Sequence, residues 1–333
     1  MTKVLIIAEV GVNHNGCLKL AKKLVDCAVA AGANIIKFQT FQADEMCHEA
    51  APKPSYQKKN SKKSENQFQM LKKLELTYYE FKKLKQYTQK KGIEFLSSAF
   101  DLSDLIFLKS LKLKRFKIPS GEITNYLYLK KIASFNQKII LSTGMSNFYE
   151  IEKAIRIIDP QKKNKKKITI MHCTSEYPAD IRKINLKVIQ TLKKKFDYII
   201  GYSDHTTSII VPALAVMMGA TIIEKHLTLN KRMKGPDHRS SLNPKEFSKM
   251  VDQIRMAEMA LGNGKKKISV TELKNAKLVR KSIFAKSNIK IGEKFTTDNL
   301  ICKRPDIGIS AFRIQNFLGK KSKKNYSKNQ IIK

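Results

Sequence analysis

Residues 198–228 read YIIGYSDHTTSIIVPALAVMMGATIIEKHLT, with two apolar runs, Tyr198–Asp204 and Thr221–Thr228, on either side of a helical pattern at Ser208–Met218. Each apolar run is continuous rather than alternating, which is typical of strands buried on both faces of a parallel sheet. The stretch therefore predicts a strand–helix–strand unit, and both of its strands end among acidic and histidine side chains.

The same unit recurs towards the N-terminus. Six further strands are predicted at Val4–Val10, Asn34–Thr40, Ile93–Phe100, Arg115–Ser120, Lys138–Gly144 and Ile168–Ser175. Helical patterns separate them, at Cys17–Ala31, Lys72–Lys91, Tyr126–Ala133, Tyr149–Ile158 and Leu186–Lys195. Eight alternations favour an α/β fold of the (β/α)8 TIM-barrel type. A doubly wound sheet is the alternative, but it would carry a G-x-G-x-x-G loop after the first strand, and Val10–Gly16 lacks this pattern.

The sequence pattern changes after the last barrel helix, which is predicted at Pro244–Leu261. We expect a catalytic barrel over residues 1–262, a linker over 263–274 and a small β-rich domain over 275–333. Residues 282–308 carry short strand patterns and glycine turns, and so small a module is marginal alone. A polar insertion at Ala43–Lys73 is long for a barrel loop, and such loops are usually functional.

The composition is strongly basic, with 65 Lys and Arg against 28 Asp and Glu and a formal charge of +37. Such a balance suits a nucleic-acid partner or an anionic membrane. The excess is almost all lysine, however, and it is spread along the whole chain, without tryptophan and without a recognisable nucleic-acid-binding motif. A nucleic-acid-binding protein is therefore the disfavoured alternative.

Five cysteines without CxxC spacing, and no apolar stretch near 18 residues, predict a cytoplasmic protein with no membrane segment.

Barrel enzymes place their active sites at the C-terminal ends of the strands. The polar residues predicted at these ends are Glu9, Lys37, Gln39, Ser98, Lys117, Ser120, Glu122, Thr143, His172, Thr174, Tyr177, Ser203, Asp204, His205, Glu224 and His226. A core strand has no structural need for the lysine in IIKFQT (35–40) or in FKIPS (116–120). Together these residues predict an active site at this rim.

His205 and His226 end two strands that would be neighbours, which suits a shared divalent ion with positions open to water or substrate. Glu224 is two residues from His226 and points the same way, so it could act directly or through a bound water. Lys37, Lys117 and the serines of the rim favour a small multiply charged anion as substrate. His172 lies within an apolar run and is interpreted as a core residue, and Cys173 shows no partner that would activate its thiol.

Motifs along nearly the whole chain resemble those of bacterial N-acetylneuraminate (sialic acid) synthases and the related legionaminate and pseudaminate synthases. They are IIAEVGVNHNG (6–16), IKFQTF (36–41), APKPSYQ (51–57), FLSSAF (95–100), FKIPSGEITN (116–125), IILSTGM (139–145), HCTSEYP (172–178), GYSDHT (201–206), IEKHLT (223–228), GPDHRSS (235–241) and KRPDIGIS (303–310). The resemblance implies a TIM barrel followed by an antifreeze-like (SAF) cap domain, in a domain-swapped homodimer whose caps cover each other's barrels.

The implied reaction is metal-dependent condensation of phosphoenolpyruvate with N-acetylmannosamine, giving N-acetylneuraminate and phosphate. An N,N′-diacetyllegionaminate or pseudaminate synthase, with the same chemistry on another acetylated sugar, is the alternative. The basic segment at 58–69 departs from the family pattern and leaves the exact sugar open.

The resemblance also assigns roles, residue by residue. The two histidines that hold the family's Mn²⁺ or Mg²⁺ ion match His205 and His226. The catalytic carboxylates match Glu9 and Glu224, either of which could be the base. Contacts to phosphoenolpyruvate match Lys37, Ser98, Lys117, Ser120, Ser175 and Ser203. Contacts to the sugar match Tyr177, Asp237 and the partner's Arg304.

Overall fold

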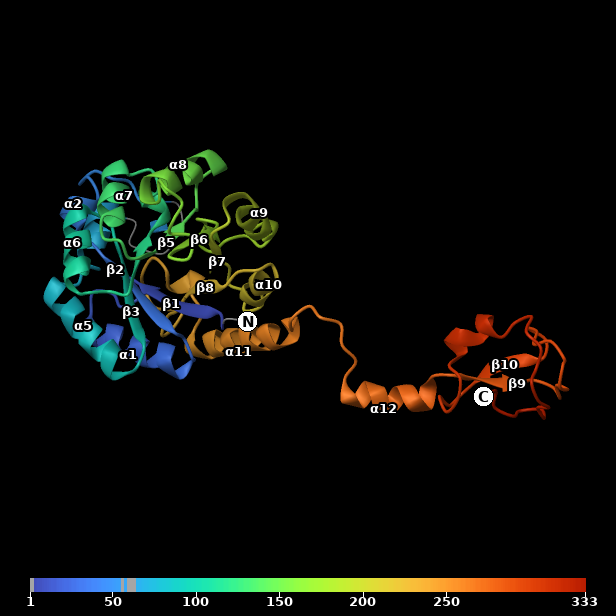
Figure 1. Ribbon diagram of the computed structural model, residues 1–333. Helices are drawn as coiled ribbons and strands as arrows, with labels where there is room; N and C mark the ends of the chain where they lie inside the picture. The colour runs from blue at the N-terminus through green and yellow to red at the C-terminus, as the bar shows by residue number, and fades with distance from the viewer. Residues whose placement is uncertain (1–2, 55–56, 59–63) are drawn as a thin grey trace. The chain divides into compact units, whose positions relative to one another are not determined.

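Eight parallel strands form a closed barrel in which each strand pairs with the next along the chain and the last pairs with the first (Figure 1). They are β1 (Leu5–Gly11), β2 (Ile35–Thr40), β3 (Glu94–Ala99), β4 (Arg115–Ile118), β5 (Lys138–Ser142), β6 (Ile168–Cys173), β7 (Ile199–Asp204) and β8 (Ile222–His226). The predicted (β/α)8 barrel is confirmed. This computed structural model describes residues 3–54, 57–58 and 64–333, so the motif at 51–57 and the basic segment at 58–69 lie partly outside the described residues.

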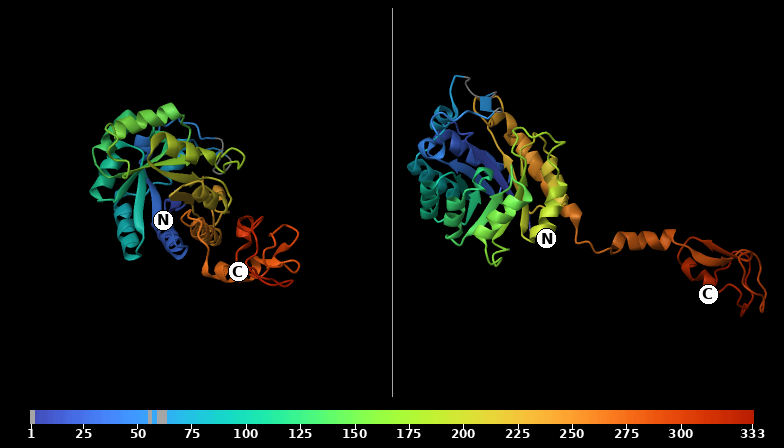
Figure 2. Two further views of the ribbon diagram at one scale, coloured as in Figure 1. Left: turned by 45° about the vertical axis from the view of Figure 1, so that its right-hand side comes forward. Right: turned by 90° about the horizontal axis from the view of Figure 1, so that it is seen from above.

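Helices surround the strands on the outside of the barrel, as two further views show (Figure 2). They are α1 (Leu18–Ala30), α5 (Tyr78–Lys90), α6 (Leu102–Ser110), α7 (Tyr126–Ala133), α8 (Phe148–Ile158), α9 (Lys187–Phe196), α10 (Val211–Met217) and α11 (Pro244–Leu261). The insertion after β2 carries the short helices α2 (Ala43–Met46) and α4 (Gln67–Lys72). No helix in the described part of the chain is long and apolar enough to cross a membrane.

The helix predicted at Lys72–Lys91 is wrong in its first turn, because α4 ends at Lys72 and α5 begins only at Tyr78. Thr77 explains the late start. Its side chain accepts a hydrogen bond from Glu80 N, and the Glu80 carboxylate accepts one from Thr77 N at 2.8 Å, which is a capping box.

The barrel interior is closed by apolar side chains, one from each of six strands. They are Ile7, Ile35, Leu96, Ile140, Met171 and Ile222. Their neighbours along the strands, such as Ile6 and Ile36, belong instead to the larger cluster that joins the strands to the helices. Since side chains alternate along a strand, the residue two positions later faces the interior again. Those residues are Glu9, Lys37, Ser98, Ser142, Cys173 and Glu224, and all of them line the same pocket.

The chain divides into two compact units, Met1–Asn263 and Gly264–Lys333. The second unit contains α12 (Val270–Val279) and an antiparallel pair, β9 (Ser282–Ala285) and β10 (Leu300–Lys303). Its own small core holds Ile283, Ala285, Ile289, Phe295, Leu300, Tyr326 and Ile332.

Helix α12 overlaps the stretch predicted as a linker at 263–274. Ser269 starts this helix through a second capping box, in which its side chain accepts a hydrogen bond from Glu272 N and the Glu272 carboxylate accepts one from Ser269 N. The S-x-x-E spacing at 269–272 is the sequence signal for it.

Candidate active site

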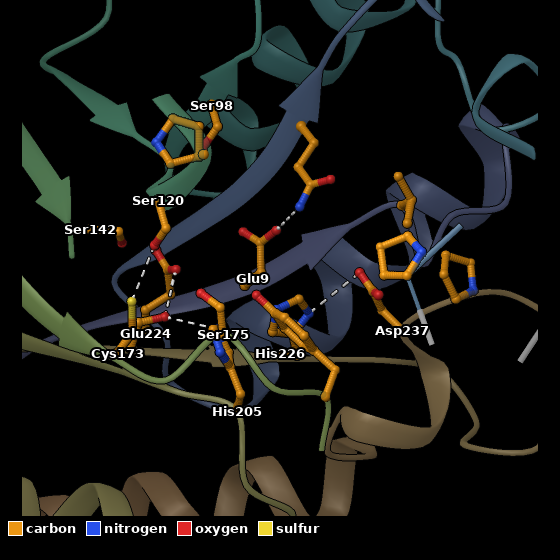
Figure 3. Close-up of a pocket in the computed structure, with 18 of the residues that line it drawn as sticks. Glu9, Ser98, Ser120, Ser142, Cys173, Ser175, His205, Glu224, His226 and Asp237 are labelled. Atoms are coloured by element: carbon orange, nitrogen blue, oxygen red, sulfur yellow. Dashed lines mark hydrogen bonds and ion pairs between the residues drawn. The ribbon is translucent and has the colours of Figure 1, made fainter. Parts of the chain in front are cut away.

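A cavity of about 920 Å³ opens at the C-terminal ends of the barrel strands (Figure 3). The residues of the first unit to which the family resemblance assigns a role all line it. They are Glu9, Lys37, Ser98, Lys117, Ser120, Ser175, Tyr177, Ser203, His205, Glu224, His226 and Asp237. Arg304, predicted as a sugar contact, is exposed in the second unit.

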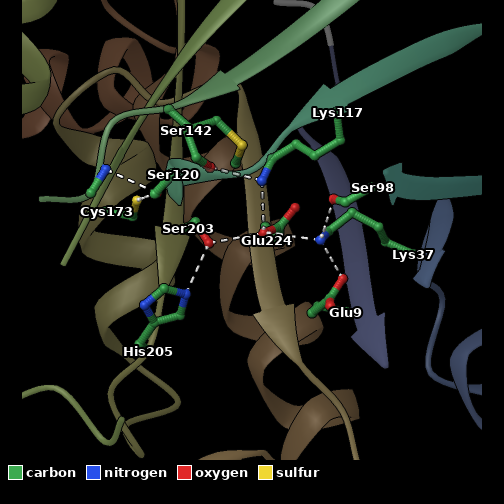
Figure 4. Close-up of polar contacts among 12 residues, drawn as sticks. Glu9, Lys37, Ser98, Lys117, Ser120, Ser142, Cys173, Ser203, His205 and Glu224 are labelled. Carbon is green, nitrogen blue, oxygen red and sulfur yellow. Dashed lines mark hydrogen bonds and ion pairs between the residues drawn. The ribbon is translucent and has the colours of Figure 1, made fainter. Parts of the chain in front are cut away.

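Strand register brings the ionisable residues of this pocket together. Glu9 is paired with Lys37 across β1 and β2, and Lys37 Nζ lies 2.6 Å from Glu9 Oε2 and 3.8 Å from Glu224 Oε1. Ser203 is paired with Glu224 across β7 and β8, and its hydroxyl donates to Glu224 Oε1 at 3.0 Å. The two lysines therefore approach one central carboxylate, as Figure 4 shows.

Lys117 is the second of these lysines, and its side chain is 3% exposed. Its Nζ donates to Ser142 Oγ at 2.7 Å and to Glu224 Oε1 at 3.3 Å. Ser120, on the turn after β4, has its Oγ 3.3 Å from Cys173 Sγ and accepts a hydrogen bond from Gly144 N. Hydroxyls and ammonium groups thus line the same side of the cavity, which is the donor set that an anionic ligand needs.

The two glutamates have different charge states. Burial alone would raise the pKa of Glu224, but Lys117 and Lys37 together lower it to about 2. Burial dominates at Glu9, where Lys37 offsets only part of the effect and the pKa is raised to about 7. Glu224 is therefore a permanent carboxylate at neutral pH, whereas Glu9 can gain and lose a proton there.

The two histidines stand at the mouth of the same cavity, with ring centroids 5.6 Å apart. His205 Nδ1 lies 2.6 Å from Thr174 O, and because a carbonyl can only accept, Nδ1 carries the hydrogen and Nε2 carries the lone pair. Burial lowers the pKa of His205 to about 4, and it lowers that of His226 well below its usual value. Both rings are therefore neutral at pH 7, the state in which imidazole can bind a metal.

Tyr177 and Asp237 close the pocket beside these rings. The Tyr177 ring stacks on His205 at 4.2 Å and meets His226 edge-on at 5.7 Å. Asp237 Oδ2 lies 4.0 Å from His226 Nδ1, and burial raises the pKa of the Asp237 carboxyl to about 6. A ligand that reached the histidines would lie beside both side chains.

Comparison with known proteins identifies the kind of site. The NeuB family matches residues 24–266, and a SAF domain matches residues 280–333. The chain belongs to the NeuB family. The resemblance seen in the motifs is confirmed, and with it the prediction of an enzyme, a transferase of the sialic acid synthase type that forms a carbon–carbon bond.

Full-length NeuB relatives are similar over the whole chain. An N,N′-diacetyllegionaminic acid synthase of Campylobacter jejuni is 50% identical over 333 residues, which cover 100% of both chains. One of Legionella pneumophila is 46% identical and covers 97% of this chain and 91% of its own. A pseudaminic acid synthase of Campylobacter jejuni is 34% identical over 99% of this chain and 96% of its own. Among solved structures, the N-acetylneuraminic acid synthetase of Leptospira borgpetersenii in complex with citrate is 37% identical, with a TM-score of 0.72, over 82% of this chain and 90% of that one.

Within this NeuB barrel, one residue predicted at the rim is wrong. The prediction took Thr143 from the fifth strand, but Thr143 Oγ1 donates to Met171 O and the residue does not line the cavity. Ser142 lines it instead and binds Lys117. Counting two residues on from Ile140 along the buried strand would have found it.

Four further rim residues lie outside the cavity lining, and one of them, Thr174, accepts a hydrogen bond from His205 Nδ1 through its carbonyl oxygen. His172, interpreted as a core residue, is only half-buried, and its Nε2 lies 2.7 Å from Ile184 O. Glu122 accepts a hydrogen bond from Asn125, and Asp204 forms an ion pair with Lys225. Cys173, by contrast, lines the cavity, although it lies within an apolar run of the sequence.

Proposed function

We propose that this NeuB enzyme condenses phosphoenolpyruvate with a 2,4-diacetamido-6-deoxy sugar of the mannose type, giving N,N′-diacetyllegionaminate and phosphate. The observation that carries the proposal is the higher full-length identity to two N,N′-diacetyllegionaminic acid synthases than to the N-acetylneuraminic acid synthetase. The alternative considered for the sequence is thus favoured over N-acetylneuraminate. Pseudaminate is less favoured, because the identity to its synthase is lower.

An apolar wall of the cavity supports this choice of sugar. Val12, Met46 and Phe100 line the cavity and belong to one apolar cluster with the insertion after β2. N-acetylmannosamine carries hydroxyl groups at C4 and C6, whereas the proposed sugar carries an acetamido group and a methyl group there. Each buried methylene or methyl contributes about 0.8 kcal/mol, so this wall favours the second sugar.

The cationic side of the cavity is the proposed site of phosphoenolpyruvate. Lys37 and Lys117 would hold its phosphate and carboxylate. The hydroxyls that accompany them are those of Ser98, Ser120, Ser175 and Ser203. The negative charges of phosphoenolpyruvate would then join those of Glu9 and Glu224 around the two lysines, whose side chains are at most 5% exposed. In a site this dry, charge–charge attraction is stronger than at the surface.

The two carboxylates have separate tasks in the proposed reaction. The methylene carbon of phosphoenolpyruvate forms a bond to the aldehyde carbon of the open-chain sugar. The aldehyde oxygen takes up a proton from solvent and becomes a hydroxyl, while a cation is left at C2 of the phosphoenolpyruvate unit. Glu224, ionised at neutral pH, stabilises that positive charge. Glu9, with a pKa near 7, takes a proton from the water that adds to C2. The bond between C2 and the phosphate oxygen then breaks, the C2 hydroxyl gives its proton to the departing phosphate, and a ketone is left at C2.

His205 and His226 would hold the divalent ion. The fit rests on their neutral rings and on His226 Nδ1, which is buried without a hydrogen-bond partner among the described residues. No set of three His, Cys, Asp or Glu side chains in residues 3–54, 57–58 and 64–333 is arranged for a metal, so water and substrate would complete the coordination. A bound Mn²⁺ or Mg²⁺ ion would supply Lewis-acid polarisation of the aldehyde oxygen.

The remaining assignments are part of the same proposal. Tyr177 and Asp237 contact the sugar, together with the partner's Arg304 in a domain-swapped homodimer. The support is the resemblance of the motifs around these residues and the exposure of Arg304. A cytoplasmic location is supported by the five cysteines, all of which are free thiols.

Phosphate release tests the proposal directly. Purified protein is assayed with phosphoenolpyruvate, Mn²⁺ or Mg²⁺, and a panel of acetylated sugars. We expect the highest kcat/KM with the 2,4-diacetamido-6-deoxy sugar; a higher value with N-acetylmannosamine would overturn the choice of acceptor.

A matched pair of variants tests the apolar wall. Met46→Gln should lower kcat/KM for the diacetamido sugar more than for N-acetylmannosamine. Met256→Gln, at an exposed position of α11, should change neither.

A further inference from the structure

The loop after β1 holds the loop after β8 through side-chain hydrogen bonds. Asn13 is 1% exposed, and its Nδ2 donates to Leu227 O at 2.9 Å and to Ser241 Oγ at 2.9 Å. Ser241 Oγ in turn donates to Asp237 O at 2.7 Å. One amide group from the first loop is thus two hydrogen bonds away from the backbone of the pocket residue Asp237.

A second asparagine of the same loop holds the residue that follows Asp237. His238 is fully buried, with its Nε2 3.1 Å from Asn15 Oδ1 and its Nδ1 2.6 Å from Thr228 Oγ1. Asn15 Nδ2 also donates to Lys234 O at 3.0 Å. Asp237 is therefore fixed from both sides, through its own carbonyl and through its neighbour.

Gly235 allows the two loops to approach this closely. Its φ of +151° lies in a region that side-chain-bearing residues rarely adopt. A Cβ at this position would lie 2.7 Å from His238 Cδ2 and 2.8 Å from Asn15 Oδ1. Any larger residue would push apart the two side chains that join the loops.

Neither asparagine lines the cavity, whereas Asp237 does, with its carboxyl 4.0 Å from His226 Nδ1. Hydrogen bonds that fix a loop backbone also fix the direction in which its side chains point. We infer that Asn13 and Asn15 are positioning residues that set the Asp237 carboxyl against the acceptor sugar. The inference rests on the proposed function, in which Asp237 contacts that sugar.

The test compares the two substrates, because the loop after β8 carries neither of the lysines proposed to bind phosphoenolpyruvate. Asn13→Ala and Asn15→Ala should each raise KM for the acceptor sugar about tenfold. Each variant removes hydrogen bonds that hold the Asp237 backbone, and the loss of one such bond corresponds to a change in affinity of about tenfold. The dissociation constant of phosphoenolpyruvate, measured calorimetrically, should stay within about twofold. Asn15 is only partly buried, so Asn15→Ala remains informative if Asn13→Ala does not fold.

The matched control is Asn34→Ala, which removes a side-chain acceptor of Ile6 N (2.9 Å) just before β2, at the opposite end of the barrel. It should lower the unfolding temperature and leave both substrate constants unchanged. A double variant, Asn13→Ala with Asp237→Asn, should bind the sugar little worse than Asp237→Asn alone, because Asn13 acts through Asp237.

Two results would overturn the inference. In the first, the wild type turns over the sugar, but Asn13→Ala and Asn15→Ala lower only the unfolding temperature, as Asn34→Ala does. In the second, the wild type releases no phosphate with any acetylated sugar, and the proposed function fails with the inference. Because the wild-type assay separates these results, the two failures are distinguishable.

Discussion

Lys225 Nζ lies 2.5 Å from Asp204 Oδ2, and both side chains are completely buried. Lys225 also donates to Thr206 O and Ser208 O, at 2.5 and 3.1 Å. Because side chains alternate along a strand, this pair occupies the outer face of β7 and β8, while their inner faces carry Ser203 and Glu224. The ion pair thus ties together the ends of the two strands that hold the histidines.

Removal of one member of this pair should be costly. Lys225→Met leaves the Asp204 carboxylate buried without its cation, so we expect a loss of about 3–5 kcal/mol in the free energy of unfolding. Urea unfolding measures it. Lys165→Met, which removes an exposed ion pair with Asp197, should cost less than about 1 kcal/mol. Equal effects of the two variants would contradict the role given to burial.

The histidine pair predicts dependence on a divalent ion. Treatment with a chelator should abolish phosphate release by the wild type, and Mn²⁺ should restore it. His205→Ala should stay inactive at the same Mn²⁺ concentration, because one of the two imidazoles is gone. His48→Ala, at an exposed histidine, should behave as the wild type. Full activity in the presence of chelator would show that the pair has another task.

Lys117 predicts a large effect on catalysis. Lys117→Met removes a buried ammonium that approaches both Ser142 and Glu224, and kcat/KM should fall by about 10²–10³. Ser142→Ala leaves the charge in place and removes one of its partners, so its effect should be smaller. Lys138→Met, at the exposed start of β5, is the control, and phosphate release is the readout. A fall of less than tenfold for Lys117→Met would exclude its proposed role.

Glu9 predicts a pH-dependent stability. Its folded pKa of about 7 lies above its ordinary value of 4.5, so the folded protein binds this proton more tightly than the unfolded chain. The tighter proton binding contributes to the free energy of unfolding. This contribution is complete below pH 4.5 and is lost as the pH rises through 7, and it amounts to about 3 kcal/mol.

Glu9→Gln cannot ionise, so its unfolding free energy should fall less between pH 3 and pH 8, by about the same 3 kcal/mol. Urea unfolding at several pH values measures the difference. Glu45→Gln, at an exposed glutamate, should retain the wild-type profile. Identical pH profiles for Glu9→Gln and the wild type would contradict the burial effect.

The barrel was predictable because its signals are local. Apolar runs such as Ile35–Thr40 have only one way to be buried, in a strand covered on both faces, and the polar residues at their ends follow from the same runs. The helix boundaries were less accurate where a cap decides them, as at Thr77 and Ser269. A capping box depends on four residues, and a hydrophobic pattern does not show it.

The sequence by itself determined the strand order, the rim that carries the chemistry and the family to which the chain belongs. These follow from periodicity and from motifs, which are properties of neighbouring residues. Only the tertiary structure decided that Glu224 is ionised while Glu9 titrates, that Ser142 replaces Thr143, and that Asn13 reaches Asp237. Each of these depends on burial and on atoms brought together from distant parts of the chain, such as Asn13 and Ser241, which lie 228 residues apart.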